Sequence, residues 1–311
     1  GRESDWNRWG VSAWDLIQPA FMFMVGVSMP FSYRRPTIAG DSRRRRLVHA
    51  LLRSLLLVLL GLFLATRPGA RTIWVFTNVL AQIGLGYFFV YLLLGRPRWQ
   101  QGLALVVVVF GTWGCMQYLD WRPIAGVAAN SADDHAAVFV DPAQGELLTG
   151  RFAPWSKNAN LAHAVDVQLL NLLADPDAAA MSAWREQMRE GPLGFVDWCQ
   201  LTIRRCLFSQ PERFVANRGG YQTLNFVPSI ATMLLGLICG GILIGTGGAG
   251  RKFFQLLALA VVCLVLGRLL GIYLCPIVKR IWTPSWALFS GGYVIGLLGL
   301  FHVLFDLSPL R

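Results

Sequence analysis

Two groups of ionisable residues stand at opposite ends of one long apolar stretch. Residues 14–33, WDLIQPAFMFMVGVSMPFSY, carry ionisable side chains only at their ends, Asp15 and Tyr33, and are long enough to cross a bilayer as a helix. The following stretch, RRPTIAGDSRRRR, supplies Arg34, Arg35, Arg43, Arg44, Arg45 and Arg46. An acid at one end and arginines at the other predict two chemically different mouths of one pathway. The alternative is an ordinary spanning helix, with Asp15 capping its first turn and the arginines only setting topology.

Other polar residues lie inside apolar runs, where they are costly and each raises a functional hypothesis. Gln18 follows Asp15 in the first run, and Asn78 and Gln82 share one helical face four residues apart. The alternative for the last two is hydrogen bonding between helices. Arg53 also lies inside a run, where the alternative is a side chain that extends its charge towards water.

Two further stretches combine polar and aromatic residues near the ends of apolar runs. In NRGGYQTLNFVPS (217–229), Tyr221 and Asn225 precede Pro228, which indicates a broken helix start of the kind tolerated where it lines a cavity. In PIVKRIWTPSW (276–286), Lys279 and Trp282 suit a sugar or an anion near the membrane surface, although tryptophans are expected there anyway. No phosphate-binding loop, HExxH, GxSxG or CxxC motif is present, so the sequence predicts no metal site.

The composition is that of a membrane protein. Of 311 residues, 55% are hydrophobic and only 14% are charged, whereas soluble proteins carry about 25% charged residues. The formal net charge is +11, but the arginines cluster at the ends of apolar runs. They therefore indicate topology and contact with membrane lipid headgroups, and no nucleic-acid partner is expected. We expect an all-α, polytopic membrane helix bundle.

Seven apolar runs predict seven transmembrane helices in a single domain, 1–311. They are 14–33, 47–66, 77–95, 102–119, 224–245, 253–275 and 286–307. The short loops on the side of 34–46 hold ten basic residues (Arg34, Arg35, Arg43–Arg46, Arg96, Arg98, Arg251 and Lys252), against four on the other side (Arg67, Arg71, Lys279 and Arg280). We expect the protein in the inner (cytoplasmic) membrane of the cell. The loop 34–46 should then face the cytoplasm, and the N-terminus and the insertion 120–223 should lie outside. Amphipathic helices in 155–173, 178–190 and 194–208 would roof the outer mouth.

Four blocks together resemble the bacterial relatives of heparan-alpha-glucosaminide N-acetyltransferase. They are WDLIQPAFMFMVGVSMPFS, TNVLAQIGLGYFFVYLL, GGYQTLNFVPSIATMLLGLICGGIL and CPIVKRIWTPSWALFSGG. The resemblance implies a transmembrane acyltransferase fold of ten or eleven helices, of which this chain would be a fragment. It also implies acetyl-CoA bound from the cytoplasm and an amino sugar or glycan acceptor reached from outside. The family histidine expected about ten residues before Asp15 has no counterpart in GRESDWNRWGVSAWD.

The leading hypothesis is therefore a membrane-embedded acyltransferase. In this hypothesis Asp15 is the candidate catalytic residue. The acceptor is assigned to Gln18, Asn78, Gln82, Tyr221, Asn225, Lys279 and Trp282. The donor is assigned to Arg34, Arg35, Arg43, Arg44, Arg45, Arg46 and Arg53. The alternatives are a transporter or flippase for a sugar or lipid-linked glycan, although no inverted repeat is apparent, and a non-catalytic scaffold that binds no coenzyme A. A homodimer is left open.

Overall fold

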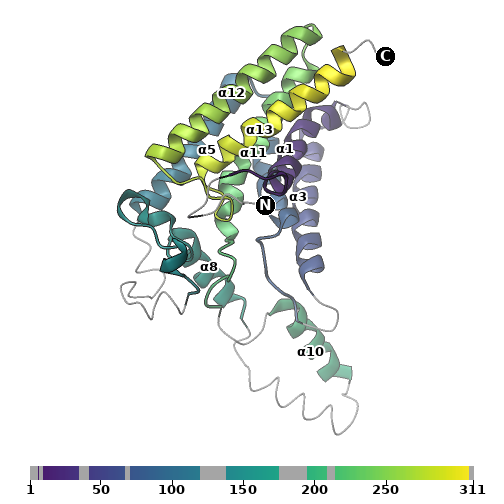
Figure 1. The fold of residues 1–311 in the computed structure, drawn as a ribbon. Coiled ribbons are helices and arrows are strands. Elements are labelled where there is room, and N and C mark those ends of the chain that lie inside the picture. Colours follow the sequence, from purple (N-terminus) through teal and green to yellow (C-terminus); the bar gives the residue numbers. More distant parts are fainter. Residues whose placement is uncertain are drawn as a thin grey trace.

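The computed structural model of the chain describes residues 6, 10–34, 42–66, 71–119, 138–174, 195–208 and 214–307. These residues form an all-helical fold (Figure 1), as expected from the composition. Arg35 and the expected helix 178–190 lie outside the described residues.

The long helices match the predicted runs to within a few residues. They are α1 (Ala13–Tyr33), α3 (Arg43–Ala65), α5 (Arg98–Tyr118), α11 (Phe226–Ile244), α12 (Ala249–Tyr273) and α13 (Pro284–His302), which a π-helical turn, η4 (Val303–Leu307), extends. These six are long and apolar enough to cross a membrane, which marks the chain as a multi-pass membrane protein. The predicted count of seven spans is not confirmed.

The seventh predicted run contains the shorter helix α4 (Val79–Leu92). It has 14 residues, or about 21 Å at 1.5 Å per residue, against about 30 Å of hydrocarbon. It starts late because the Asn78 side chain caps it by accepting the Ala81 N–H (2.9 Å), and residues 71–77 before it are extended. Thr72 N–H of this extended segment donates to Arg205 O of α10 (Phe195–Leu207).

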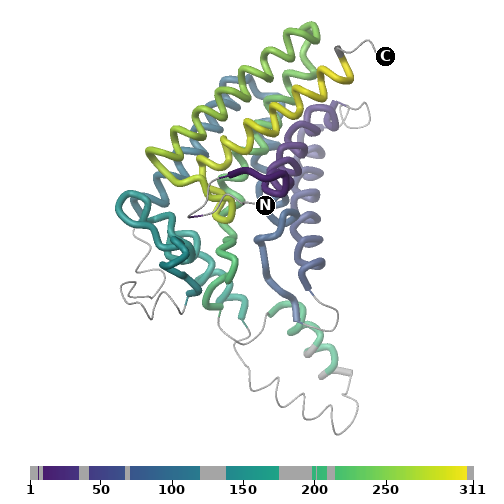
Figure 2. Tube along the Cα trace, viewed as in Figure 1, coloured from purple at the N-terminus to yellow at the C-terminus, as the bar shows by residue number. Residues whose placement is uncertain are grey.

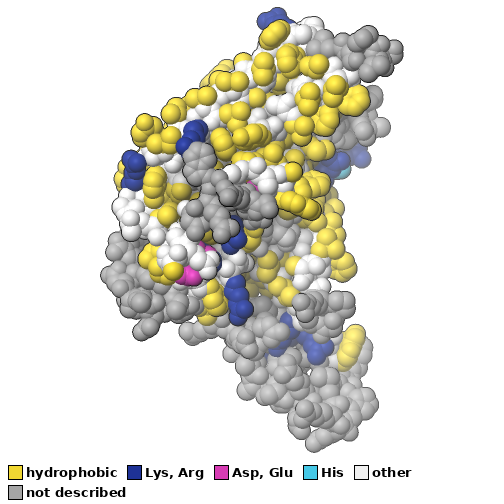
Figure 3. Space-filling view, viewed as in Figure 1, with side chains coloured by type: hydrophobic (Ala, Val, Ile, Leu, Met, Phe, Trp, Pro, Cys, Tyr) yellow, Lys and Arg dark blue, Asp and Glu magenta, His cyan; other side chains and the backbone are white. Residues whose placement is uncertain are grey.

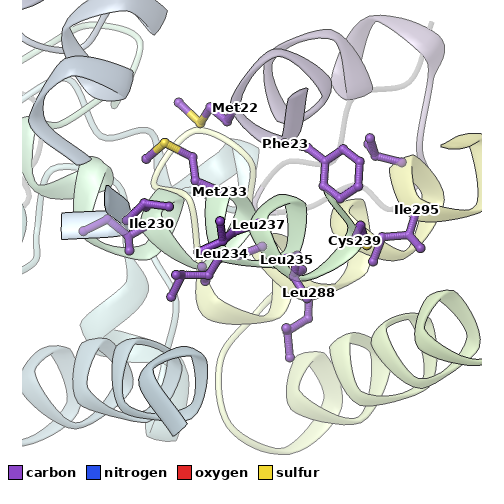
Figure 4. Packing of buried hydrophobic residues seen from close by; sticks show 14 of the residues in the cluster. Met22, Phe23, Ile230, Met233, Leu234, Leu235, Leu237, Cys239, Leu288 and Ile295 are labelled. Carbon is purple, nitrogen blue, oxygen red and sulfur yellow. The ribbon is translucent and has the colours of Figure 1, made fainter. Parts of the chain in front are cut away.

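Helix α11 is the centre of the bundle and packs along α1 through glycines. A Cβ on Gly26 of α1 would strike Met233 O, and a Cβ on Gly236 of α11 would strike Phe23 O. Gly240, one helical turn further, faces Val27 O in the same way. Small residues spaced by four allow two membrane helices to approach backbone to backbone. Buried apolar side chains of both helices fill the space around this crossing (Figure 4).

The remaining helices pair in the same manner. Helix α12 lies along α13, where Gly267 faces the Phe289 backbone and Gly292 faces Ala260 O. Helix α3 lies along α4, and Ser54 Oγ donates to Gly84 O between them. The outward faces carry exposed leucine, valine and phenylalanine, and hydrophobic side chains cover the visible face of α12 and α13 (Figure 3). In a soluble protein such a surface would aggregate, whereas here it fits lipid.

The two ends of the bundle differ. Residues of the loops after α1, α4 and α11 meet around one cavity at one end. The short helices η1 (Pro142–Gln144), η2 (Gly150–Trp155) and α8 (Leu161–Leu172) lie towards the other end, where α8 packs on η3 (Thr223–Asn225), the turn before α11 (Figure 2). The predicted amphipathic helices in 155–173 and 194–208 thus correspond to α8 and α10. The compartments that the two ends face remain predictions from the basic residues.

The glycine contact predicts a sharp difference between two alanine substitutions. Gly236→Ala should lower the free energy of unfolding by about 1–3 kcal/mol, because its methyl group overlaps the α1 backbone. Gly296→Ala on the exposed face of α13 has nothing within 4 Å and should be neutral or stabilising by up to about 1 kcal/mol. Thermal unfolding of both variants in detergent checks this, and equal midpoints would refute the proposed role of the glycine crossing.

Candidate functional site

Asp15 and Lys279, predicted separately from the sequence, form a buried ion pair. Lys279 Nζ donates to Asp15 Oδ1 at 3.1 Å, and Asp15 has no exposed surface. Its other oxygen, Oδ2, accepts the Ser12 N–H and the Ser12 hydroxyl, each at 3.0 Å. Asp15 therefore stabilises the first turn of α1, as the ordinary-helix interpretation expects, and also holds the loop before α13 against that turn.

Two more of the predicted residues belong to this region: Trp282 lies in the same loop, and Asn225 binds the loop from the start of α11. Asn225 Nδ2 donates to Arg280 O at 2.6 Å, so this side chain joins the start of α11 to the loop. Trp282 is 1% exposed, adopts a left-handed backbone conformation (φ 47°) and donates from Nε1 to Thr232 Oγ1 (3.4 Å). In this conformation its ring packs in the core and is not open to an acceptor. The starts of α1, α11 and α13 thus meet around Asp15, Asn225 and Lys279.

Gln82 and Asn78 bind backbone at the same end of the bundle. Gln82 Nε2 lies within hydrogen-bonding distance of Phe76 O (3.2 Å), Gln222 O (3.2 Å) and Thr223 O (3.4 Å). It therefore joins the segments that precede α4 and α11. Asn78 Nδ2 donates to Gly61 O of α3 (3.3 Å). This is the hydrogen bonding between helices that the alternative interpretation expects. Gln18 and Tyr221 are half-buried.

Helix α8 adds polar residues that the sequence reasoning did not select. Asp166 accepts the Thr223 N–H with Oδ1 and Oδ2 (3.2 and 3.0 Å), and His163 lies one turn earlier, 2% exposed. Nε2 of His163 and both amide ends of the buried Gln222 have no hydrogen-bond partner in the described structure. Buried polar groups usually find partners, so these atoms indicate internal water or a polar ligand. The signal in the sequence was the pair HAVD at helical spacing.

Burial shifts the pKa values of these two groups in opposite directions. Desolvation lowers the pKa of His163 to about 4, because the imidazolium form has lost its water. Desolvation also raises the pKa of the Asp166 carboxyl to about 6, against the opposite effect of its hydrogen bonds from Thr223. Burial therefore shifts both groups towards their neutral forms: His163 is neutral at pH 7, whereas Asp166 gains its proton only below about pH 6.

The other end of the bundle holds a cavity of about 640 Å³ lined by five arginines. They come from three loops or helix ends: Arg34, Arg43, Arg46, Arg96 and Arg98. Of the arginines assigned to the donor, Arg44 and Arg45 are exposed and do not line this cavity, and Arg53 lines a different one. Arg96 and Arg98 had been interpreted only as topology determinants. The rings of Tyr33 and Tyr91, 5.1 Å apart between centroids, form part of the same wall.

The acidic and cationic ends are separated by the length of α1. Asp15 and Tyr33 are 18 residues apart, or about 27 Å along the helix. Asp15 lines neither the arginine cavity nor a second, apolar cavity between α1, α3 and α4. The expected opposition of acid and arginines is therefore present. The expected open mouth is not seen at Asp15, whose carboxylate is fully buried and paired with Lys279.

No protein-family model matches the chain, and no curated protein sequence is significantly similar to it. The resemblance to the heparan-alpha-glucosaminide N-acetyltransferase relatives therefore stays a prediction. Among the residues that the structure describes, no three His, Cys, Asp or Glu side chains are grouped so as to hold a metal ion.

Removing one partner of the Asp15–Lys279 pair should be worse than removing both. Lys279→Met leaves a buried carboxylate without its cation and should cost about 3–5 kcal/mol of unfolding free energy. The double variant Asp15→Asn/Lys279→Met should recover much of this loss. Unfolding in detergent measures both, with Arg251→Met, an exposed cation, as the control that should be near neutral. Additive losses in the double variant would contradict the pairing.

The opposite pKa shifts predict opposite pH slopes in two variants. The variant Asp166→Asn keeps His163, whose pKa is lower in the folded than in the unfolded chain. Between about pH 4 and 6.5 the imidazole is therefore protonated more in the unfolded chain, and stability should rise with pH in this window. His163→Gln leaves Asp166, whose raised pKa makes the folded chain bind the proton more readily between about pH 4 and 6. Stability should then fall as pH rises, by up to about 1.4 kcal/mol per pH unit.

Unfolding midpoints at pH 4, 5, 6 and 7 in detergent measure these slopes. In the unsubstituted protein the two slopes oppose one another over most of the window, so its stability should vary little. His49→Gln, an exposed histidine on α3, is the control that should leave the profile unchanged. Parallel profiles for the His163 and Asp166 variants would contradict the assignment.

Proposed function

We propose that the protein is a membrane-embedded acyltransferase. It takes acetyl-CoA in the arginine cavity and transfers the acetyl group to an amino sugar or glycan that arrives at the Asp15 end. The observation that carries this proposal is the cavity of about 640 Å³ into which three separate parts of the chain direct five arginines. The resemblance in four sequence blocks supplies the reaction class.

The cavity has the chemistry that a coenzyme A head requires. Guanidinium groups bind phosphate in a bidentate manner and keep their charge under all conditions. The volume falls within the range of about 300–1,000 Å³ that small-molecule sites occupy. Among the described residues that line the cavity none is acidic, so these arginines have no carboxylate among their described neighbours in the wall. The basic residues on this side of the membrane favour a cytoplasmic location, where the donor is made.

Transfer of the acetyl group to an amine requires a group near the acceptor that can remove a proton. The amine nitrogen attacks the thioester carbonyl, the carbon–sulfur bond breaks and the coenzyme leaves as a thiolate, and the amine must lose a proton. We assign Asp15 as the group that accepts this proton, which later passes to the thiolate of the departing coenzyme. Its partner Lys279 is the cation that an incoming amino sugar would replace, because both present an ammonium group to the same carboxylate oxygen.

Two pairs of arginines in the first turn of α3 provide a test of the donor site. Arg43→Gln/Arg46→Gln removes two arginines that line the cavity, and Arg44→Gln/Arg45→Gln removes two that do not, with the same loss of net charge. Binding of coenzyme A to the purified protein, followed by calorimetry, should weaken at least tenfold in the first variant, since a hydrogen bond to a charged group contributes about 1.5–3 kcal/mol. The second variant should stay within about twofold of the parent protein.

The reaction is tested in vesicles that contain the protein. Labelled acetyl groups should pass from acetyl-CoA to glucosamine or a glycan, and Asp15→Asn should abolish this transfer. Equal losses of coenzyme A binding in both arginine variants would reject the donor site. Movement of the sugar across the bilayer without an acetylated product would instead assign the protein to the transporter class.

A further inference from the structure

A second cavity lies on the lipid side of the bundle, in a groove between α1, α3 and α4. It has a volume of about 740 Å³ and is lined almost entirely by apolar side chains, among them Phe21, Val25, Leu56, Leu60 and Leu80. Phe21 and Leu56 are more than half exposed (57% and 62%), so the groove opens outwards, where the bilayer lies. An apolar groove open to the bilayer takes up hydrocarbon rather than water.

One end of this groove is polar and cationic. Arg53 lines it together with Ser32 and Tyr87, and its Nη1 lies within hydrogen-bonding distance of Ser32 Oγ (3.5 Å) and Tyr87 Oη (3.4 Å). The Tyr33 ring lies 6.0 Å from the Arg53 Cζ. Arg53 takes part in none of the ion pairs that join two described residues, which are Lys157–Glu146, Lys279–Asp15 and His302–Asp306. An arginine inside a membrane span requires a counter-charge.

The polar and apolar parts of the groove are arranged like the headgroup and the acyl chain of a lipid. Ser32 is the last residue but one of α1, so the Arg53 guanidinium is level with the arginine-rich end of that helix. From Arg53 the groove runs seven residues along α3 to Leu60, or about 10 Å into the hydrocarbon. A phosphate at Arg53 would have its acyl chain lying against Leu56 and Leu60. This arrangement fits a lipid of the leaflet at the arginine-rich end, where anionic headgroups meet basic residues.

We propose that this groove binds an anionic phospholipid, with the phosphate on Arg53 and an acyl chain along α3 and the first half of α4. This site is separate from the arginine cavity, because no described residue lines both of them. Arg53 is therefore assigned to lipid rather than to the donor. The assignment does not depend on the acyltransferase proposal.

The test compares phosphatidylglycerol with phosphatidylcholine on the purified full chain. Native mass spectrometry in a mild detergent should show bound phosphatidylglycerol in preference to phosphatidylcholine. Arg53→Gln should weaken phosphatidylglycerol binding roughly tenfold, as expected for a charged hydrogen bond, and Arg53→Lys should retain most of it. Arg251→Gln, an exposed arginine at the same end of the bundle, should bind as the parent protein does.

A second variant keeps the test valid if Arg53→Gln does not fold. Leu56→Trp fills the groove from its exposed side and leaves Arg53 in place. It should reduce labelling by a phosphatidylglycerol that carries a photoreactive group on its acyl chain, and labelled peptides of the parent protein should map to α1, α3 and α4. Equal labelling of the parent and Leu56→Trp, or equal binding of the two lipids, would overturn the proposal. Loss of a dimer in Leu56→Trp would also overturn it, because the groove would then be covered by a second copy of the chain.

Discussion

The close approach of α1 to α11 is the constraint on which both ends of the molecule depend. Gly26, Gly236 and Gly240 let the two backbones touch, so the relative position of the helices is fixed without adjustable side chains between them. At one end this crossing places Asp15 against the loop that carries Lys279. At the other end it places Tyr33 beside Leu237 and Gly241 in the wall of the arginine cavity. A shift along this contact would separate the ion pair and change the shape of the cavity together.

Some of the cations at the arginine cavity have a structural role, because they bind the C-terminal ends of helices. The other arginines are not explained in this way. The C-terminal ends of α1, α4 and α11 meet there, and helix C-termini attract cations. Arg98 Nη2 donates to Gly241 O (3.4 Å), and Lys252 Nζ, nearby, donates to Leu243 O (2.7 Å). These bonds satisfy helix ends. Arg34, Arg43 and Arg46 also line the cavity, and like charges that are brought together repel one another. No described residue of the cavity wall is a carboxylate that would offset this repulsion, which supports the proposed anionic ligand.

The sequence predicted the helices and their grouping better than it predicted the contacts. Apolar runs located the spans, and basic residues identified the loops that share an end, because both signals are local. The Asp15–Lys279 pair joins positions 264 residues apart, and no periodicity reports such a contact. Gln82 was selected as a polar residue in a span, but its amide binds non-helical backbone that hydropathy cannot reveal. His163 and Asp166 were missed because they lie outside the membrane runs, where polarity is ordinary.

The short length of α4 affects the path by which the proposed donor and acceptor would meet. Exposed backbone groups cannot face lipid, so the extended segments before α4 and α11 require a polar or protein-filled surrounding. Gln82 supplies part of it by binding carbonyls of both segments, and α8 adds Asp166 on the Thr223 N–H. The apolar barrier beside α4 is therefore about 21 Å, the length of its 14 residues, rather than the full 30 Å or so of a bilayer. In the proposed reaction, a hydrophilic acceptor that entered beside α8 would therefore have less hydrocarbon to cross before it reached a donor held by the arginines.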